Sequence, residues 1–456
     1  MSVFSLEYFG MLFVTPFLSW IFNNKTRKYL ILLANVLFMF LILKNTVSIV
    51  YALILAGYTW LSGMILSNNK NKTTLFISLI FPVLGLVFFK YAGYFSKNII
   101  MPLGLSFYTF KVISYLVDIY NKKVKAQGIV NVYAYILFFP CFLAGPIHRS
   151  KDFFVELKKP FRFKYQDQKN GFILMMLGFF EKLVIGDELF RVMNIFSSND
   201  VFTGIYKFFA LVLYAFYIYV DFDSYSNIAI GASRMLGFHL NRNFHTPYLA
   251  VSIQDFWSRW HISLSTWLKD YIYIPLGGNR KGIVRKYINV LIVFLVSGLW
   301  HGSTLMFVIW GIGHGLSNII EDAIHRLVPS YQKMKFLSPI RILIHFMLVS
   351  ILWVFFKSGS MNEAISFFQS IFVSSKITNT YLFEHISQNE LLWTFVLLGI
   401  VIITDICRYY TDMITFLSKR IFIIRWVFYI VLILFAIVFG VYGPGYHAQD
   451  FIYVTF

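Results

Sequence analysis

The feature that most constrains this chain is the long apolar run Tyr287–Leu316. It reads YINVLIVFLVSGLWHGSTLMFVIWGIGHGL, and after its first residue only His301 and His314 are ionisable. A helix crosses the bilayer core with about 20 residues, so a single helix of this length would overshoot the membrane. Gly298 and Gly302 flank the first histidine and mark the natural place for a break or a close helix contact. We therefore predict two hydrophobic halves with a histidine between them, inside the membrane.

The position of His301 permits two interpretations. An ionisable group inside a membrane is costly, so it is by default a candidate functional residue. A neutral histidine that hydrogen-bonds a neighbouring helix would suit the same position equally well. Position alone does not choose between them.

The composition places the whole chain in the membrane. Of its 456 residues, 58% are hydrophobic and only 13% are charged, whereas a soluble domain has about 25% charged residues. The bilayer admits only helices and closed barrels, and the apolar segments have helical length, so we predict an all-α integral membrane protein. We expect about a dozen transmembrane and re-entrant helices in a single polytopic domain, residues 1–456.

The basic residues set the expected orientation. The net charge of +19 would suggest a nucleic-acid partner in a soluble protein, but here the basic residues lie in loops between apolar segments. We therefore expect the lipid bilayer, and no nucleic acid, as the partner of this charge. The positive-inside rule places the loops Asn23–Lys28 and His148–Lys169 in the cytosol, and both chain termini outside. Arg408 is counted among the basic residues of the last cytosolic loop.

Cys141 and Cys407 lie in apolar sequence, so no disulfide framework is expected.

Two segments depart from simple membrane spans. Tyr133–Ile147 is short and contains two prolines and a glycine, so we expect a re-entrant or tilted segment that is buried in protein. The span near residues 171–190 carries Glu181, Lys182 and Asp187, and it should face protein or water instead of lipid.

The segment Ser252–Ile274 has the pattern of an amphipathic helix. Trp257, Trp260 and other apolar residues recur on one face, and polar residues occupy the opposite face. His261 falls at the edge of the apolar face if the helix is continuous. Such a helix lies in the interface or packs along a bundle, and it should end at Pro275. A surface helix with an incidental histidine is the simpler alternative.

The residues leave three kinds of chemistry to weigh. Two histidines near the membrane, one of them buried, suit general acid–base work on a hydroxyl group. The histidines have no accompanying carboxylate or cysteine, so we expect no metal site. A transporter needs charges that pair along a path near the midplane, and such charges are present at Glu181, Lys182, Asp221 and Asp223.

Six ordered stretches of the chain form a distinctive set of motifs. They are RWHISLSTWLKDYIYIPLGGN at Arg259–Asn279, SGLWHG at Ser297–Gly302, WGIGHG at Trp310–Gly315, PLGLSFYTF at Pro102–Phe110, FFP at Phe138–Pro140 and AGPI at Ala144–Ile147. Together they resemble the membrane-bound O-acyltransferase (MBOAT) superfamily and, within it, the alginate O-acetyltransferase branch, the AlgI-like proteins. The resemblance covers roughly residues 85–320, with residues 1–84 and 321–456 as additional N-terminal and C-terminal helices.

The resemblance implies a bundle of membrane helices around a central tunnel. It implies that His301 lies at the narrow point as the base that acts on the acceptor, with His261 as a second catalytic residue nearer the cytosol. Trp310 could line the passage. The residues expected to line or support the tunnel are Trp300, Trp260, Asp270, Asn279, His314 and Ser263.

The resemblance also implies the reaction. The acyl donor is expected to be cytosolic acetyl-CoA, with no tightly bound cofactor. The acyl group would cross the bacterial cell membrane for O-acetylation of an extracellular or cell-wall polysaccharide. An extracytoplasmic SGNH-hydrolase-like protein would complete the esterification.

Two alternatives stay open. The sister branch of D-alanyl transferases acting on teichoic acids (DltB-like) is the first, and a transporter or flippase of a glycan precursor is the second. The alginate O-acetyltransferase branch usually has the motif Asp-Phe-Ser-Gly-Tyr-Ser-Asp. Here it reads DFDSYSN, which adds a carboxylate at Asp223 and replaces the last one by Asn227.

Overall fold

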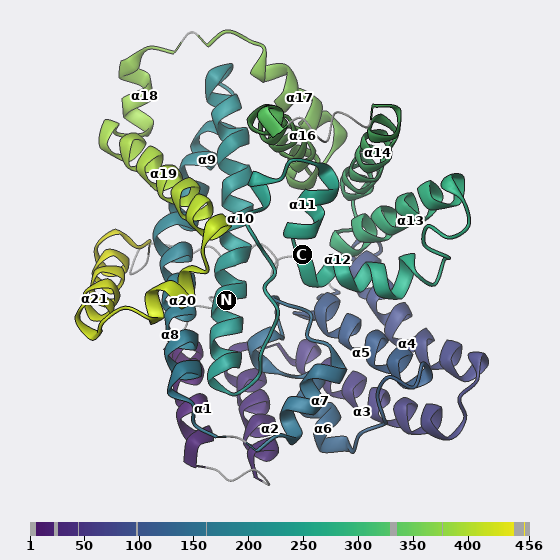
Figure 1. The fold of residues 1–456 in the computed structure, drawn as a ribbon. Helices are drawn as coiled ribbons and strands as arrows, with labels where there is room; N and C mark the ends of the chain where they lie inside the picture. Colours follow the sequence, from purple (N-terminus) through teal and green to yellow (C-terminus); the bar gives the residue numbers. More distant parts are fainter. Residues whose placement is uncertain are drawn as a thin grey trace. The chain divides into compact units, whose positions relative to one another are not determined.

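The computed structural model describes residues 6–21, 26–43, 45–96, 99–160, 162–328, 335–375, 377–441 and 451. Throughout these ranges the regular structure is helical and no strand occurs, which confirms the all-α prediction (Figure 1). Both chain termini lie outside the described residues.

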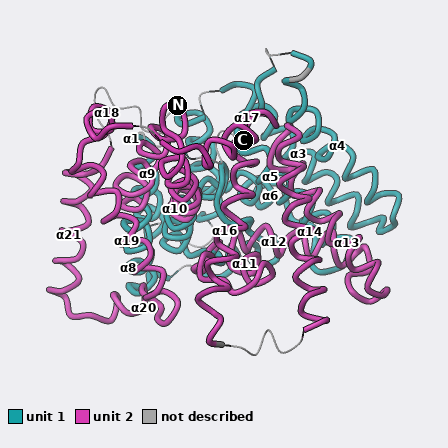
Figure 2. The backbone as a smooth tube through the Cα atoms, turned by 90° about the horizontal axis from the view of Figure 1, so that it is seen from above, with its two compact units in different colours: residues 1–178, 225–242, 448–456 teal, residues 179–224, 243–447 magenta. Residues whose placement is uncertain are grey.

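The chain divides into two compact units, which Figure 2 shows in different colours. Unit 1 comprises residues 1–178, 225–242 and 448–456, and unit 2 comprises residues 179–224 and 243–447. A single domain over residues 1–456 stays a prediction.

Unit 1 is built from the N-terminal helices and the end of α10. Its helices are α1 (Leu6–Ile21), α2 (Arg27–Phe38), α3 (Thr46–Asn68), α4 (Lys72–Tyr91), α5 (Leu105–Tyr120), α6 (Ile129–Ile136), α7 (Ser150–Lys158) and most of α8 (Tyr165–Phe180).

Unit 2 holds most of α10 and the later helices. They are α9 (Asp187–Ser198), α10 (Ile205–Met235), α11 (Ile253–Arg259), α12 (Ile262–Leu268), α13 (Ile283–His301), α14 (Leu305–Leu327), α16 (Ser338–Lys357), α17 (Met361–Ile371), α18 (Asn379–His385), α19 (Gln388–Tyr410), α20 (Met413–Ser418) and α21 (Phe422–Phe439).

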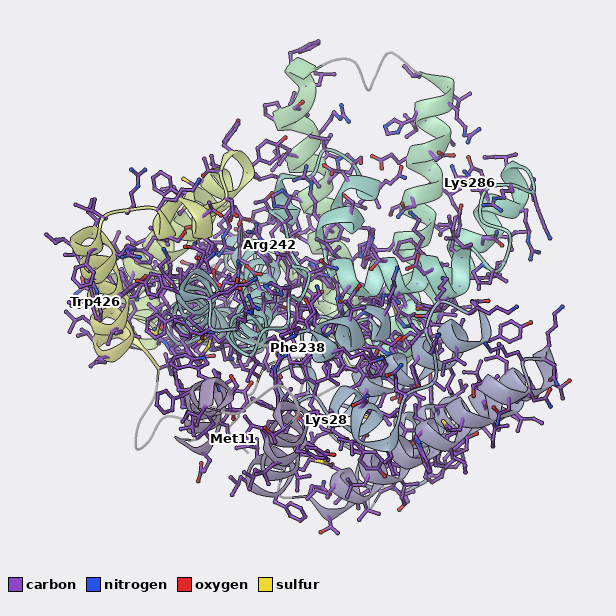
Figure 3. The ribbon with its side chains drawn as sticks, turned by 60° about the horizontal axis from the view of Figure 1, so that its bottom comes forward. Met11, Lys28, Phe238, Arg242, Lys286 and Trp426 are labelled. Atoms are coloured by element: carbon purple, nitrogen blue, oxygen red, sulfur yellow. The ribbon has the colours of Figure 1, made fainter. Side chains whose placement is uncertain are left out.

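Seven helices among the described residues are long and apolar enough to cross a membrane: α3, α4, α10, α13, α16, α19 and α21. Many of their large apolar side chains are exposed, as expected of a lipid-facing surface; Trp426 on α21 is 50% exposed and is labelled in Figure 3. The chain is therefore a multi-pass membrane protein. The other segments counted in the expected dozen are shorter, interrupted or more polar.

The apolar run that opens the second half of the chain is a helical hairpin. α13 ends at His301, Gly302 follows in an extended conformation, and α14 begins at Leu305. A Cβ atom at Gly298 would overlap the backbone carbonyl of Phe307, so this glycine permits the close approach of the two helices. Both predicted roles, a break and a close contact, are confirmed.

An ion pair and a hydrogen bond hold the other end of this hairpin. Lys286 lies near the start of α13 and is labelled in Figure 3. Its Nζ atom is 2.7 Å from Oδ1 of Asp322 on α14. The Tyr287 hydroxyl donates to the second oxygen of the same carboxylate at 3.0 Å.

The predicted re-entrant segment is confirmed as short, irregular and buried within unit 1. α6 ends at Ile136, and residues 137–148 are buried with little regular structure. Asn35 of α2 satisfies part of this backbone, because its side chain donates to Ala134 O at 3.2 Å and accepts from Phe139 N at 3.0 Å. Buried irregular backbone needs such partners, which explains why the segment lies in protein.

The prediction of one continuous amphipathic helix over Ser252–Ile274 was wrong. The helix breaks at Trp260 and His261 into α11 and α12, and a π-helical turn, Lys269–Tyr273, follows. The helical phase that placed His261 at the edge of one apolar face therefore does not apply. The helical structure ends before Pro275, and the turn that follows has Gly277 and Gly278 at positive φ.

Candidate active site

His301 is the last residue of α13, and its side chain is almost fully buried at 3% exposure. Three aromatic rings surround the imidazole. The ring centroids lie 4.8 Å away for Trp300, 5.0 Å for Trp310 of α14 and 5.2 Å for Phe356 of α16. The histidine therefore lies in a dry aromatic setting, where a neutral imidazole is far cheaper to bury than a charged one.

His261 owes its position to the break between α11 and α12. Its backbone is left-handed (φ 41°, ψ 53°), an uncommon conformation for a residue other than glycine. Asn243 stabilises the break, because its backbone carbonyl accepts from Ile262 N at 2.9 Å and its side chain accepts from Ser263 N at 3.3 Å. These bonds occupy two amide groups at the start of α12 that no helical carbonyl could reach.

The two candidate catalytic histidines share one neighbour. His261 is fully buried; its ring lies 4.7 Å from Phe222 of α10 and 6.2 Å from Trp300, centroid to centroid. Since Trp300 also contacts His301, the structure brings both predicted histidines to one aromatic cluster within unit 2.

His314 belongs to the same cluster but has a different bonding state. The Trp257 indole N–H donates to His314 Nδ1 at 3.3 Å, so the neutral ring carries its proton on Nε2. His314 also packs against Trp310, with centroids 5.0 Å apart. Its Nδ1 lone pair is engaged, which fits a supporting role better than that of a base.

The other predicted support residues divide into two groups. Trp260 and Ser263 are buried, and the Trp260 ring lies 5.0 Å from that of Trp353 on α16. Asp270 and Asn279 are exposed, on the π-helical turn and in the turn before α13. The structure therefore does not bring these two side chains into the buried aromatic cluster.

Sequence inspection missed several partners of the histidines. Phe356 and Asn243 carried no signal, since each acts through a contact between distant parts of the chain. Phe222 could have been found, because it lies inside the DFDSYSN motif that the resemblance had already marked.

The charged residues considered for a transport path all take part in ion pairs. Lys182 Nζ, which is fully buried, lies 2.8 Å from Asp187 Oδ1 and 2.7 Å from Asp221 Oδ1. The π-helical turn Glu181–Gly186 carries this lysine between α8 and α9.

A second group of ion pairs involves Glu181 and Asp223, which are close in sequence to Lys182 and Asp221 of the first group. The Arg408 guanidinium is 2.5 Å from Glu181 Oε1 and 2.7 Å from Asp223 Oδ2. Arg408 therefore lies within helix α19 and forms ion pairs there. The prediction that counted it among the residues of the last cytosolic loop was wrong. The carboxylate that departs from the usual motif, Asp223, has this arginine as its partner.

Among the described residues, no group of three or more histidine, cysteine, aspartate or glutamate side chains could hold a metal ion. The site instead offers two imidazoles in an aromatic, water-poor setting. Such an arrangement is suited to proton transfer to and from a hydroxyl group.

The sequence profile of the membrane-bound O-acyltransferase family matches residues 107–361. The chain belongs to this family. The matched range includes both candidate histidines and their aromatic neighbours from α10 to α16. This chain is thus an O-acyltransferase.

Relatives of this acyltransferase come from several bacteria. The chain is 33% identical to a probable alginate O-acetylase of Pseudomonas aeruginosa, over 81% of this chain and 75% of that protein. It is 32% identical to the peptidoglycan O-acetyltransferase of Helicobacter pylori, over 65% of this chain and 64% of the relative. Similarity to the teichoic acid D-alanyltransferase of Bacillus subtilis is lower, at 29% identity over 53% of this chain and 63% of the relative. These bacterial relatives imply that the enzyme resides in the cell membrane.

Proposed function

We propose that this acyltransferase moves an acetyl group from cytosolic acetyl-CoA to an acceptor at the outer face, for O-acetylation of an extracellular or cell-wall polysaccharide. The observation that carries the proposal is the 33% identity to an alginate O-acetylase over 81% of the chain. The lower identity and shorter coverage of the D-alanyltransferase favour acetyl over D-alanyl transfer.

In this proposal His301 is the general base. The imidazole takes the proton of the acceptor hydroxyl while the hydroxyl oxygen attacks the thioester carbonyl. The C–S bond then breaks, the ester forms, and the proton goes to the departing thiolate of coenzyme A. A buried neutral imidazole can accept the proton at little cost of initial desolvation. His261, through the shared neighbour Trp300, would position the donor or assist the second proton transfer.

The positive-inside rule supports the direction of transfer. Arg280, Lys281, Arg285 and Lys286 surround the start of α13, which we propose to be cytosolic. Eighteen residues later, about 27 Å along the helix axis, His301 would lie near the outer face, where the acceptor arrives. The same rule places the N-terminus and C-terminus outside the cell.

We also propose an extracytoplasmic partner. A base embedded in the membrane can activate only a hydroxyl group that reaches it, whereas a polysaccharide is extended and hydrated. An SGNH-hydrolase-like protein at the outer face would pass the acetyl group on to the polymer. No tightly bound cofactor is needed for this chemistry.

The test compares base-labile acetate on surface glycan from cells with the wild-type protein, a deletion or His301→Ala at matched membrane levels. We expect acetate to fall equally in the deletion and the His301→Ala variant, because the base is lost while the fold is kept. Loss of base-labile D-alanine in place of acetate would identify the sister reaction. If neither ester changes, the proposed reaction is wrong, and transport of a glycan precursor becomes the next hypothesis.

A further inference from the structure

Unit 1 contains a surface cavity that the proposed reaction does not use. Its volume is about 120 Å³, and it lies between the start of α2, the α7–α8 connection and the end of α10. The basic side chains that line it are Arg27, Lys159, Arg162, Lys164, Arg234 and His239. All of these residues belong to one unit.

The two carboxylates of the cavity are already engaged. Glu156 Oε1 lies 3.0 Å from His239 Nδ1, and Asp167 Oδ1 lies 3.2 Å from Arg234 Nε. The hydrogen bond with Glu156 raises the pKa of His239, which favours the charged form of this imidazole. The carboxylates thus hold Arg234 and His239 in place.

Arg27 forms the fixed floor of the cavity. It is only 2% exposed, and its guanidinium donates to the backbone carbonyls of Leu236 and Glu156. The guanidinium carbon also lies 4.8 Å from the centroid of the Phe238 ring, which Figure 3 labels. These carbonyl and ring contacts fix the position of the guanidinium in the cavity.

Lys159, Arg162 and Lys164 form the accessible rim. All three side chains are exposed, and none has an ion pair within the described parts of the chain. The first turn of α8 lines the same cavity through Asp167 and Gln168, and helix N-termini favour anions. The cavity lining thus contains five lysine and arginine side chains but only two carboxylates, and both carboxylates are already in ion pairs.

We infer that this cavity is a phosphate-binding site. Its small volume suits one phosphate group, and a mixed set of arginine and lysine donors matches phosphate chemistry. The phosphate could belong to coenzyme A or to an anionic phospholipid of the cytosolic leaflet. Only this choice of source rests on the proposed function and orientation; the binding site itself does not.

The experiment measures binding without turnover. The purified full chain, in phosphatidylcholine nanodiscs, is titrated with pyrophosphate and separately with coenzyme A. Nanodiscs that contain phosphatidylglycerol provide the lipid arm, with retained lipid counted by native mass spectrometry. The test variant combines Arg162→Gln with Lys164→Gln on the rim of the cavity. The control combines Lys151→Gln with Lys158→Gln, which removes the same charge from exposed positions on α7 that do not line the cavity.

We expect the rim variant to bind pyrophosphate about 10-fold more weakly than wild type, and the control to change less than about two-fold. Competition by coenzyme A would identify the donor as the source, and preferential loss of retained phosphatidylglycerol would identify the lipid. Equal weakening in the rim and control variants, or no binding of any probe, would overturn the site. His301→Ala should bind pyrophosphate normally, so failure of the proposed reaction and failure of this site are separate results.

Discussion

At the scale of single residues, the left-handed backbone of His261 allows chemistry and geometry to be separated. An L-residue in this conformation costs about 1–2 kcal/mol, whereas glycine adopts it freely. We expect His261→Gly to lose most acetyl transfer, because the imidazole is removed. Relief of the backbone strain should offset part of the thermal stability that the cavity left by the buried ring costs. Normal transfer by a stable His261→Gly enzyme would remove this histidine from the site.

At the scale of helices, the α13–α14 hairpin depends on a glycine contact. We expect Gly298→Ala to destabilise the protein by about 1–3 kcal/mol, because its Cβ would overlap Phe307 O. The matched control is Gly399→Ala in α19, where nothing lies within 4 Å of an added Cβ and helix propensity should give a neutral or slightly stabilising result. Thermal melting of both variants in detergent provides the comparison; equal melting temperatures would show that the helices can separate at little cost.

The ion pairs between α10, α19 and the π-helical turn make a second prediction about helices. Arg408→Gln leaves Glu181 and Asp223 without their cation, and we expect a loss of about 3 kcal/mol in stability. The control is Lys419→Gln, at an exposed position directly after α20. It should change the stability by less than about 0.5 kcal/mol. A fully stable Arg408→Gln protein would mean that these charges are present for another purpose, and the transporter hypothesis would regain support.

At the scale of the whole molecule, the proposed orientation can be read by labelling intact cells. In a Cys407→Ser background, where the remaining Cys141 is buried, we expect a membrane-impermeant maleimide to label Ser374→Cys and not Lys158→Cys. Both positions are exposed; the first follows α17, and the second lies in the most basic connection of the chain. Labelling at residue 158 alone would show that the proposed topology is inverted, and the proposed direction of acetyl transfer would be inverted with it.

The sequence alone determined the features that depend on local pattern. Apolar length and charge content predicted a helical membrane protein, the glycines around His301 predicted the hairpin, and the prolines of Tyr133–Ile147 predicted a buried irregular segment. Each follows from the composition or spacing of neighbouring residues, which constrains the backbone directly.

Only the tertiary structure decided where the helices break and which side chains meet. The break at His261 is stabilised by Asn243, and the partner of Glu181 is Arg408, 227 positions away in the chain. Helical periodicity carries no information about such partners, because a hydrogen bond or ion pair between distant segments forms only after the helices have packed. For the same reason, the sequence linked His261 and His301 only through a resemblance, whereas the structure shows that both rings contact Trp300.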